Sequence, residues 1–172
     1  MESLKIVLFC IVAACLYGIG HDMITAHTCV QYFTVAHPMI IPTASPVVLA
    51  LLWGVIATWW VGLLLGIPLA IACRAGRKNK KTVRDLVRPV LILLAAMFVL
   101  SMLAGLLGYN ASRAGVVFLI EPLASRIPAD LHHRFLFDLW AHQAAYAVGI
   151  IGGFIIVTWI AVKRIKKAMR QE

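Results

Sequence analysis

Residues 47–73 read VVLALLWGVIATWWVGLLLGIPLAIAC, an apolar run without a single charged side chain. Three further apolar stretches occupy residues 4–20, 90–109 and 139–162. Each reaches or approaches the ~20 residues that a helix needs to cross ~30 Å of hydrocarbon. Helices satisfy their backbone hydrogen bonds without leaving an open edge in lipid. The sequence therefore predicts an all-α polytopic membrane protein, a four transmembrane helix bundle forming one membrane domain over residues 1–172.

The positive charges indicate how this bundle is oriented. Thirteen of the sixteen Lys and Arg residues fall at Lys5, within residues 74–88 or within residues 163–170. Basic residues concentrate on the cytoplasmic side, so we expect both termini and the loop 74–89 there, with outer loops at residues 21–46 and 110–138. A basic rim at the membrane surface favours anionic lipid headgroups as partners. We expect no nucleic acid partner.

Glycines, prolines and one candidate capping residue predict where the helices bend, begin and end. We expect the first span to be an uncleaved helix that bends or frays near Gly18 and Gly20, followed by a short extended or re-entrant piece at residues 30–35. Pro68 should kink the second helix, the third should start after Pro89, and Asp130 should cap the fourth. Small residues four apart occur in three of the spans and predict a tight bundle. They also leave a homo-oligomer open.

The histidines and acids mark the part of the chain where chemistry is expected. All six histidines fall in the outer stretches or just inside them. Asp138 and His142 are four residues apart and share a helix face, while His21 and Asp22 lie at matching depth on the first helix. First and last helices of a four-helix bundle are commonly neighbours, so these four side chains should converge. Imidazole with carboxylate suits a divalent metal such as Zn, Fe or Mn, and His37 is a further ligand candidate or an outer lid.

The same residues admit other interpretations. With a metal bound, Asp22 would orient a ligand or act as a catalytic base. Without one, the Asp–His pairs would be structural clamps in a non-catalytic scaffold. A redox protein is a third class, with His21 and His142 as axial haem ligands or with a quinone. Whether the protein is an enzyme stays open, as do the roles of Cys29 and Glu121.

The string GIGHDMITAHTCVQYFTVAHP at residues 18–38 and DLWAHQAAY at residues 138–146 carry a resemblance. The chain resembles an uncharacterised family of small four-span bacterial membrane proteins with an HDxxTAxxCxxYFTxxHP-like motif. That pattern has glutamate where this chain has Gln31 and arginine where it has His27. The resemblance implies a bacterial inner (plasma) membrane location and implies no activity.

Overall fold

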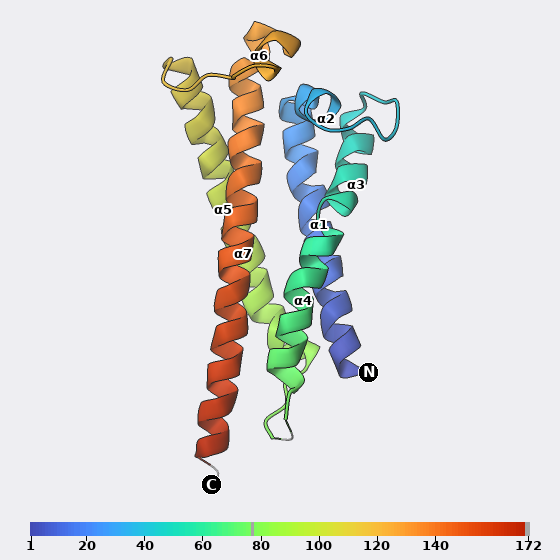
Figure 1. Cartoon of the computed structure of the whole chain (residues 1–172), viewed down its shortest axis with the longest axis vertical. Coiled ribbons are helices and arrows are strands. Elements are labelled where there is room, and N and C mark those ends of the chain that lie inside the picture. The colour runs from blue at the N-terminus through green and yellow to red at the C-terminus, as the bar shows by residue number, and fades with distance from the viewer. Residues whose placement is uncertain (77, 171–172) are drawn as a thin grey trace.

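The computed structural model describes residues 1–76 and 78–170, and within them it shows helices, turns and loops but no strand (Figure 1). Four segments are long and apolar enough to cross a membrane: α1 (Glu2–Thr28), α3 (Pro46–Ile56) with α4 (Trp59–Arg74), α5 (Val83–Arg113), and the 3-10 turn η1 (Ala129–Leu131) with α7 (His132–Met169). Two short helices, α2 (Val30–Val35) and α6 (Leu123–Arg126), lie between them. The predicted all-α fold with four candidate spans is confirmed.

The first helix is longer than the sequence led us to expect. It continues through Gly20 to Thr28 and ends where Cys29 turns to an extended conformation, with φ −150° and ψ 93°. A glycine inside a helix costs only about 1 kcal/mol relative to alanine, so one glycine does not end a helix that packing stabilises. His21 and Asp22 therefore lie inside α1, about two turns before its end, and not in an outer loop.

The second span is interrupted, but not at the predicted position. The break between α3 and α4 falls at Ala57 and Thr58. The Thr58 hydroxyl donates to the Gly54 carbonyl, and its backbone N–H donates to the Val55 carbonyl at 3.2 Å in a tighter turn. A threonine that bonds back to the preceding turn competes with the helix and bends it. Pro68, where we expected the kink, lies within α4.

Three other local expectations are wrong. The third span begins before Pro89, because Thr82 and Asp85 form a capping box in which the Asp85 carboxylate accepts the Thr82 backbone N–H at 2.9 Å. Asp130 makes no side-chain cap at the start of the fourth span. Residues 30–35 form the helix α2, so the extended alternative is wrong, while the re-entrant alternative stays a prediction. The helices thus extend beyond the apolar stretches from which they were predicted.

The spans are arranged as two helix pairs (Figure 1). Helix α1 packs along α3 and α4, α5 packs along α7, and the pairs meet chiefly between α4 and α7. Where α1 meets Gly54 of α3 and Gly62 of α4, backbone lies against backbone. A Cβ atom at Gly54 would lie 2.5 Å from the Ile19 nitrogen, and one at Gly62 would lie 2.6 Å from the Cys10 carbonyl oxygen. Small residues allow this close approach, as predicted for the bundle.

The two ends of the bundle differ in content. The start of α1, the C-terminal end of α7 and the facing ends of α4 and α5 lie at one end of the bundle, and α2 and α6 lie at the other (Figure 1). One buried apolar cluster sits towards the α2 end around Phe135, and a second sits towards the opposite end around Leu86. Large apolar side chains such as Leu64, Leu107 and Phe154 are exposed on the outside, as a lipid-facing surface requires.

Candidate metal centre

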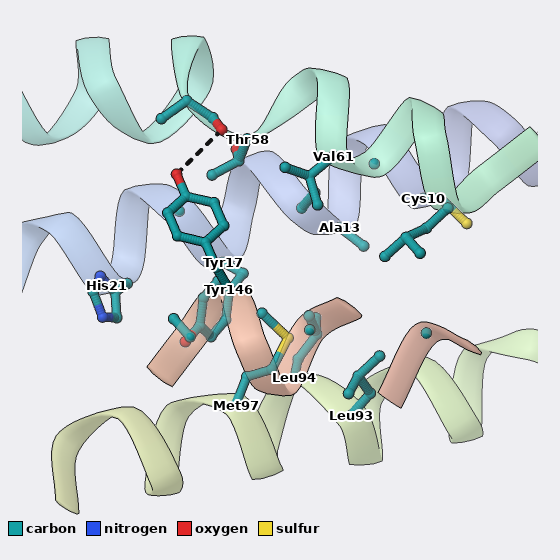
Figure 2. Close-up of a pocket in the computed structure, with 18 of the residues that line it drawn as sticks. Cys10, Ala13, Tyr17, His21, Thr58, Val61, Leu93, Leu94, Met97 and Tyr146 are labelled. Carbon is teal, nitrogen blue, oxygen red and sulfur yellow. Dashed lines mark hydrogen bonds between the residues drawn. The ribbon is translucent and has the colours of Figure 1, made fainter. Parts of the chain in front are cut away.

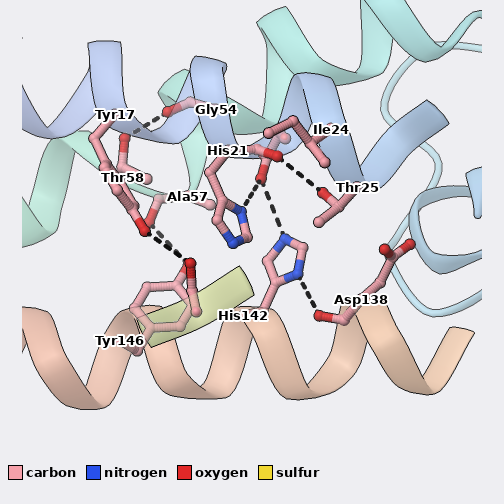
Figure 3. A network of polar contacts seen from close by, with 12 residues as sticks. Tyr17, His21, Ile24, Thr25, Gly54, Ala57, Thr58, Asp138, His142 and Tyr146 are labelled. Carbon is pink, nitrogen blue, oxygen red and sulfur yellow. Dashed lines mark hydrogen bonds and ion pairs between the residues drawn. The ribbon is translucent and has the colours of Figure 1, made fainter. Parts of the chain in front are cut away.

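A group of three ionisable side chains joins the two helix pairs towards the α2 end. His21 and Asp22 come from α1, and His142 comes from α7 (Figure 3). Asp22 Oδ1 lies 3.3 Å from His21 Nδ1 and 3.2 Å from His142 Nε2. One ligand atom from each residue lies within 4.8 Å of the other two, and this is the one such trio among the described residues. The predicted convergence of the first and last helices is therefore present for these three side chains.

The group is withdrawn from solvent. His21 is 3% exposed and Asp22 is 5% exposed, and the His142 side chain is 12% exposed. Buried charged groups are costly unless they are paired, hydrogen-bonded or bound to a metal. No lysine or arginine is in ion-pair contact with Asp22 in the described chain, so the two imidazoles are its only recorded charge partners.

The tautomer of His142 is set by the backbone of its own helix. His142 Nδ1 donates to the Asp138 carbonyl oxygen at 2.7 Å, so Nδ1 carries a proton. In a neutral imidazole the other nitrogen, Nε2, then presents a lone pair. That lone pair faces the Asp22 carboxylate, which is also an acceptor when it is ionised. A shared cation or an additional proton must lie between the two atoms.

His21 has a ring nitrogen without a partner. Its Nδ1 contacts Asp22, while its Nε2 is buried and has no hydrogen-bond partner. The ring stacks on Tyr17 at 5.8 Å between centroids and packs edge-on against His142 at 4.6 Å. Tyr17 lies four residues before His21 on the same helix. This spacing was available in the sequence, but we did not single out Tyr17.

Asp138 does not join the trio. His142 bonds the backbone carbonyl of Asp138, and the Asp138 carboxylate is turned away from the His142 ring (Figure 3). That carboxylate is 0% exposed, and both of its oxygens lack a hydrogen-bond partner. The expected Asp138–His142 side-chain pair is therefore absent, as ligand pair and as clamp. The spacing of four placed both residues on one face but did not fix where the carboxylate points.

His37 lies next to the trio but outside it. Its Nδ1 donates to the Tyr32 carbonyl at 2.9 Å, and its ring packs against Trp53 at 4.7 Å and Tyr32 at 5.0 Å between centroids. Tyr32 also stacks on His142 at 4.4 Å. Burial lowers the pKa of His37 below its usual value, which keeps the ring neutral at pH 7. His37 thus belongs to an aromatic layer that covers the site, and its ring is not among the three grouped ligand atoms.

The other polar residues of the outer stretches have local partners. The Cys29 thiol is buried and donates to the Gln31 side-chain oxygen at 3.5 Å; burial, followed by the nearby Asp138 charge, raises the pKa of Cys29 to about 11. Glu121 accepts the Ser125 hydroxyl at 2.7 Å, so it stabilises the α6 turn. His27 bonds the Met23 carbonyl, and His132 bonds the carbonyls of Ala124 and Ile127. The His133 ring packs edge-on against the Tyr109 ring.

A cavity of about 140 Å³ adjoins the trio and extends along the seam between the helix pairs (Figure 2). Tyr17, Thr58 and Tyr146 line it beside the trio. The Tyr146 hydroxyl donates to the Ala57 carbonyl, 3.4 Å away, at the break between α3 and α4. Farther from the trio the lining is apolar, with small residues such as Ala13 and Gly149. The trio is therefore at one end of an internal space.

The donor set fits a small divalent ion. Ligands ~2.0–2.2 Å from a tetrahedral ion lie ~3.3–3.6 Å apart, close to the two distances measured to Asp22 Oδ1. Three protein ligands are also the usual number at sites that keep a fourth position for water or substrate. The haem alternative does not fit here, because axial imidazoles face each other across the porphyrin plane. In this structure His21 and His142 pack edge-on, and Asp22 bridges them.

Comparisons with protein-family models, with curated proteins and with solved structures give no match to this chain.

Proposed function

We propose that this chain is an integral membrane metal-binding protein that holds Zn, Fe or Mn between α1 and α7. His21, Asp22 and His142 supply the ligands. The observation that carries the proposal is the position of Asp22 Oδ1 between two imidazole nitrogens, one of which presents a lone pair in its neutral form. A cation placed among them would satisfy the Asp22 carboxylate and the His142 lone pair at once, and His21 Nδ1 would be the third ligand in the tautomer that carries its proton on Nε2. Neutral imidazole and carboxylate are suitable ligands for these ions.

A metal ion held by three protein ligands would keep a fourth coordination position for water or substrate, as in catalytic metal sites. A bound divalent ion polarises a carbonyl or phosphoryl oxygen or lowers the pKa of bound water. A metal-dependent membrane enzyme acting on a lipid or on a periplasmic small molecule is the corresponding function. Asp22 Oδ1 is shared by both imidazoles, which supports a ligand role for Asp22 more directly than the role of general base.

The surroundings of the site belong to the same proposal. The resemblance of residues 18–38 to the bacterial four-span family supports an inner-membrane location. The basic residues of the α4–α5 connection and of the C-terminal region support cytoplasmic termini beside anionic headgroups. The site would then face the periplasmic half of the bilayer. A homo-oligomer through exposed small residues is a further proposal.

The test is metal content measured beside thermal stability. The full chain is purified in detergent without added metal, analysed for elements, stripped with chelator and then reloaded with Zn²⁺, Mn²⁺ or Fe²⁺ in separate samples. We expect about one ion per chain and a higher melting temperature with the preferred ion. A protein that retains no metal and shows no shift with any of the three contradicts the proposal. A Soret band in the visible spectrum would instead support haem.

A structural clamp is the second candidate, and one observation favours it. The two distances to Asp22 Oδ1 also suit hydrogen bonds from protonated imidazoles. In that case Asp22 would tie α1 to α7 without an ion. The Asp22 variant described below separates the two candidates.

A further inference from the structure

The cavity beside the trio changes character along its length. The part nearest the trio, towards the α2 end of the bundle, contains the polar groups of the trio and the hydroxyls of Tyr17, Thr58 and Tyr146. The part farther from the trio is lined almost entirely by apolar side chains and glycines, among them Ala13, Ala14, Leu69, Leu94 and Val157. Buried water needs two to four polar partners, so this apolar part is not built to hold water.

The dimensions of the cavity restrict what it can hold. On α1 the lining runs from Asp22 to Cys10, which is ~18 Å at 1.5 Å per residue. On α7 it runs from His142 to Val157, or ~22 Å. Half of the hydrocarbon core is only ~15 Å thick, so the cavity reaches past the membrane midplane. The cavity is therefore an elongated slot along the seam between the two helix pairs. It is only partly enclosed, so a chain that exceeds its volume of about 140 Å³ would extend along the open seam.

We propose that this slot binds one linear hydrocarbon chain of an amphiphile whose oxygen-bearing head lies at the metal centre. The proposal rests on the proposed function and names its substrate class. The slot takes the chain because apolar side chains and lost water contacts favour methylene groups there. The ion on His21, Asp22 and His142 attracts an anionic or carbonyl oxygen in its open position. The surrounding bilayer supplies molecules of this chemistry at high local concentration.

The residues on either side of the trio fit this orientation. Above it, the rings of Tyr32, Phe33, His37 and Trp53 line the slot and pack against one another, which places the apolar passage on the other side of the trio. Below it, Ala13 and Ala14 line the slot with small side chains, where larger ones would narrow it. The head is therefore at the trio and the chain end is near Leu69, Leu94 and Val157.

The test uses photolabelling of the full chain in nanodiscs of dioleoylphosphatidylcholine loaded with zinc. The probe is hexadecanoic acid with a diazirine near the chain end, and a phosphatidylcholine carrying the same chain is the second probe. We expect labelled peptides to include Leu69, Leu94 or Val157, and unlabelled hexadecanoate but not hexanoate to compete. Labelling by the free acid alone assigns a free single-chain amphiphile, and labelling by both assigns one chain of a phospholipid.

A blocking variant and a matched control sharpen this test. Ala14→Phe places a ring in the slot and should reduce slot labelling about tenfold, the effect of excluding roughly two methylene groups. Ala95→Phe adds the same ring at an exposed position of α5 outside the slot and should leave labelling unchanged. A zinc-induced melting shift in both variants shows that each is folded.

The outcomes separate the two proposals. Labels confined to exposed residues such as Leu64 and Phe154, with zinc binding intact, overturn the chain site and leave the metal site standing. Slot labelling that competes with hexadecanoate in a protein that binds no metal supports the chain site and overturns the metal centre. Equal labelling of Ala14→Phe and wild type also overturns the chain site.

Discussion

At the scale of single residues, Asp22 determines what the site is. Its Oδ1 faces an imidazole from its own helix and another from α7. If a metal is bound, Asp22→Asn removes a ligand and a charge. We expect this variant to stay folded with chelator present, because the empty site loses an uncompensated buried carboxylate. We expect it to lose stabilisation by metal, which for wild type at about 100 Kd is ~2.7 kcal/mol, or roughly 5–10 °C in Tm.

His27→Ala is the control for this comparison. His27 lies on the same helix, is exposed, and bonds only a backbone carbonyl of the preceding turn. It should keep the full metal-induced shift in thermal melts. A clamp gives the opposite result for Asp22→Asn: wild type shows no shift with any metal, and the variant melts lower by the equivalent of about 3–5 kcal/mol, the cost of breaking a buried pair.

Asp138 permits a second prediction at this scale. Its carboxylate is fully buried and has no hydrogen-bond partner. A polar group buried in this way costs about 1–3 kcal/mol, and more if it is charged. Asp138→Leu, which replaces the carboxyl by an apolar group of similar size, should therefore raise Tm in the presence of chelator, while Asp130→Leu at an exposed position should leave it unchanged. A lower Tm for Asp138→Leu would show that this carboxylate has a stabilising partner.

The candidate site was predictable in part from the sequence. His21, Asp22 and His142 lie at matching depth, and depth together with helix adjacency was enough to bring them together. The direction of the Asp138 carboxylate was not predictable, because His142 satisfies its Nδ1 with a carbonyl of its own helix. A spacing of four specifies a shared face but not a rotamer.

At the scale of elements, glycines decide how α1 meets its neighbours. Gly54→Ala would place a methyl group 2.5 Å from the Ile19 nitrogen, a backbone atom that cannot move aside alone. We expect a loss of about 1–3 kcal/mol, seen as a lower Tm. Gly20→Ala is the matched control on α1, since its Cβ would meet nothing within 4 Å. That variant should be neutral or stabilising. Equal losses in both variants would contradict the close packing.

The number of spans followed from hydropathy, whereas their ends and breaks did not. Helix ends depend on local hydrogen bonds. The capping box of Thr82 and Asp85, for example, starts the third helix at Val83, six residues before Pro89. The break at Thr58 depends on a side-chain bond to Gly54 that competes with helix propagation. Proline breaks helices more strongly than threonine does, yet Pro68 lies within α4 and the second span breaks at Thr58.

At the scale of the whole molecule, the charge distribution predicts topology. The start of α1 and the C-terminal end of α7 lie at the same end of the bundle as the facing ends of α4 and α5 (Figure 1). Accessibility labels at Lys80 and at the C-terminus should therefore report the cytoplasm, and a label at Ser45 should report the periplasm. Labelling is measured with a membrane-impermeant reagent on intact and on permeabilised cells. Finding Ser45 and Lys80 on the same side would contradict the four-span topology.

The division of the bundle into two helix pairs has a mechanical consequence. Backbone contacts at Gly54 and Gly62 fix α1 against α3 and α4, so relative motion is easiest at the seam with α5 and α7. Two ligands of the proposed centre stand on one side of this seam and the third stands on the other. An ion bound there would cross-link the two helix pairs. Its removal would let the pairs move apart and would allow a lipid to enter the seam laterally from the bilayer. Spin labels on α1 and α7 should accordingly report a broader distance distribution after chelation.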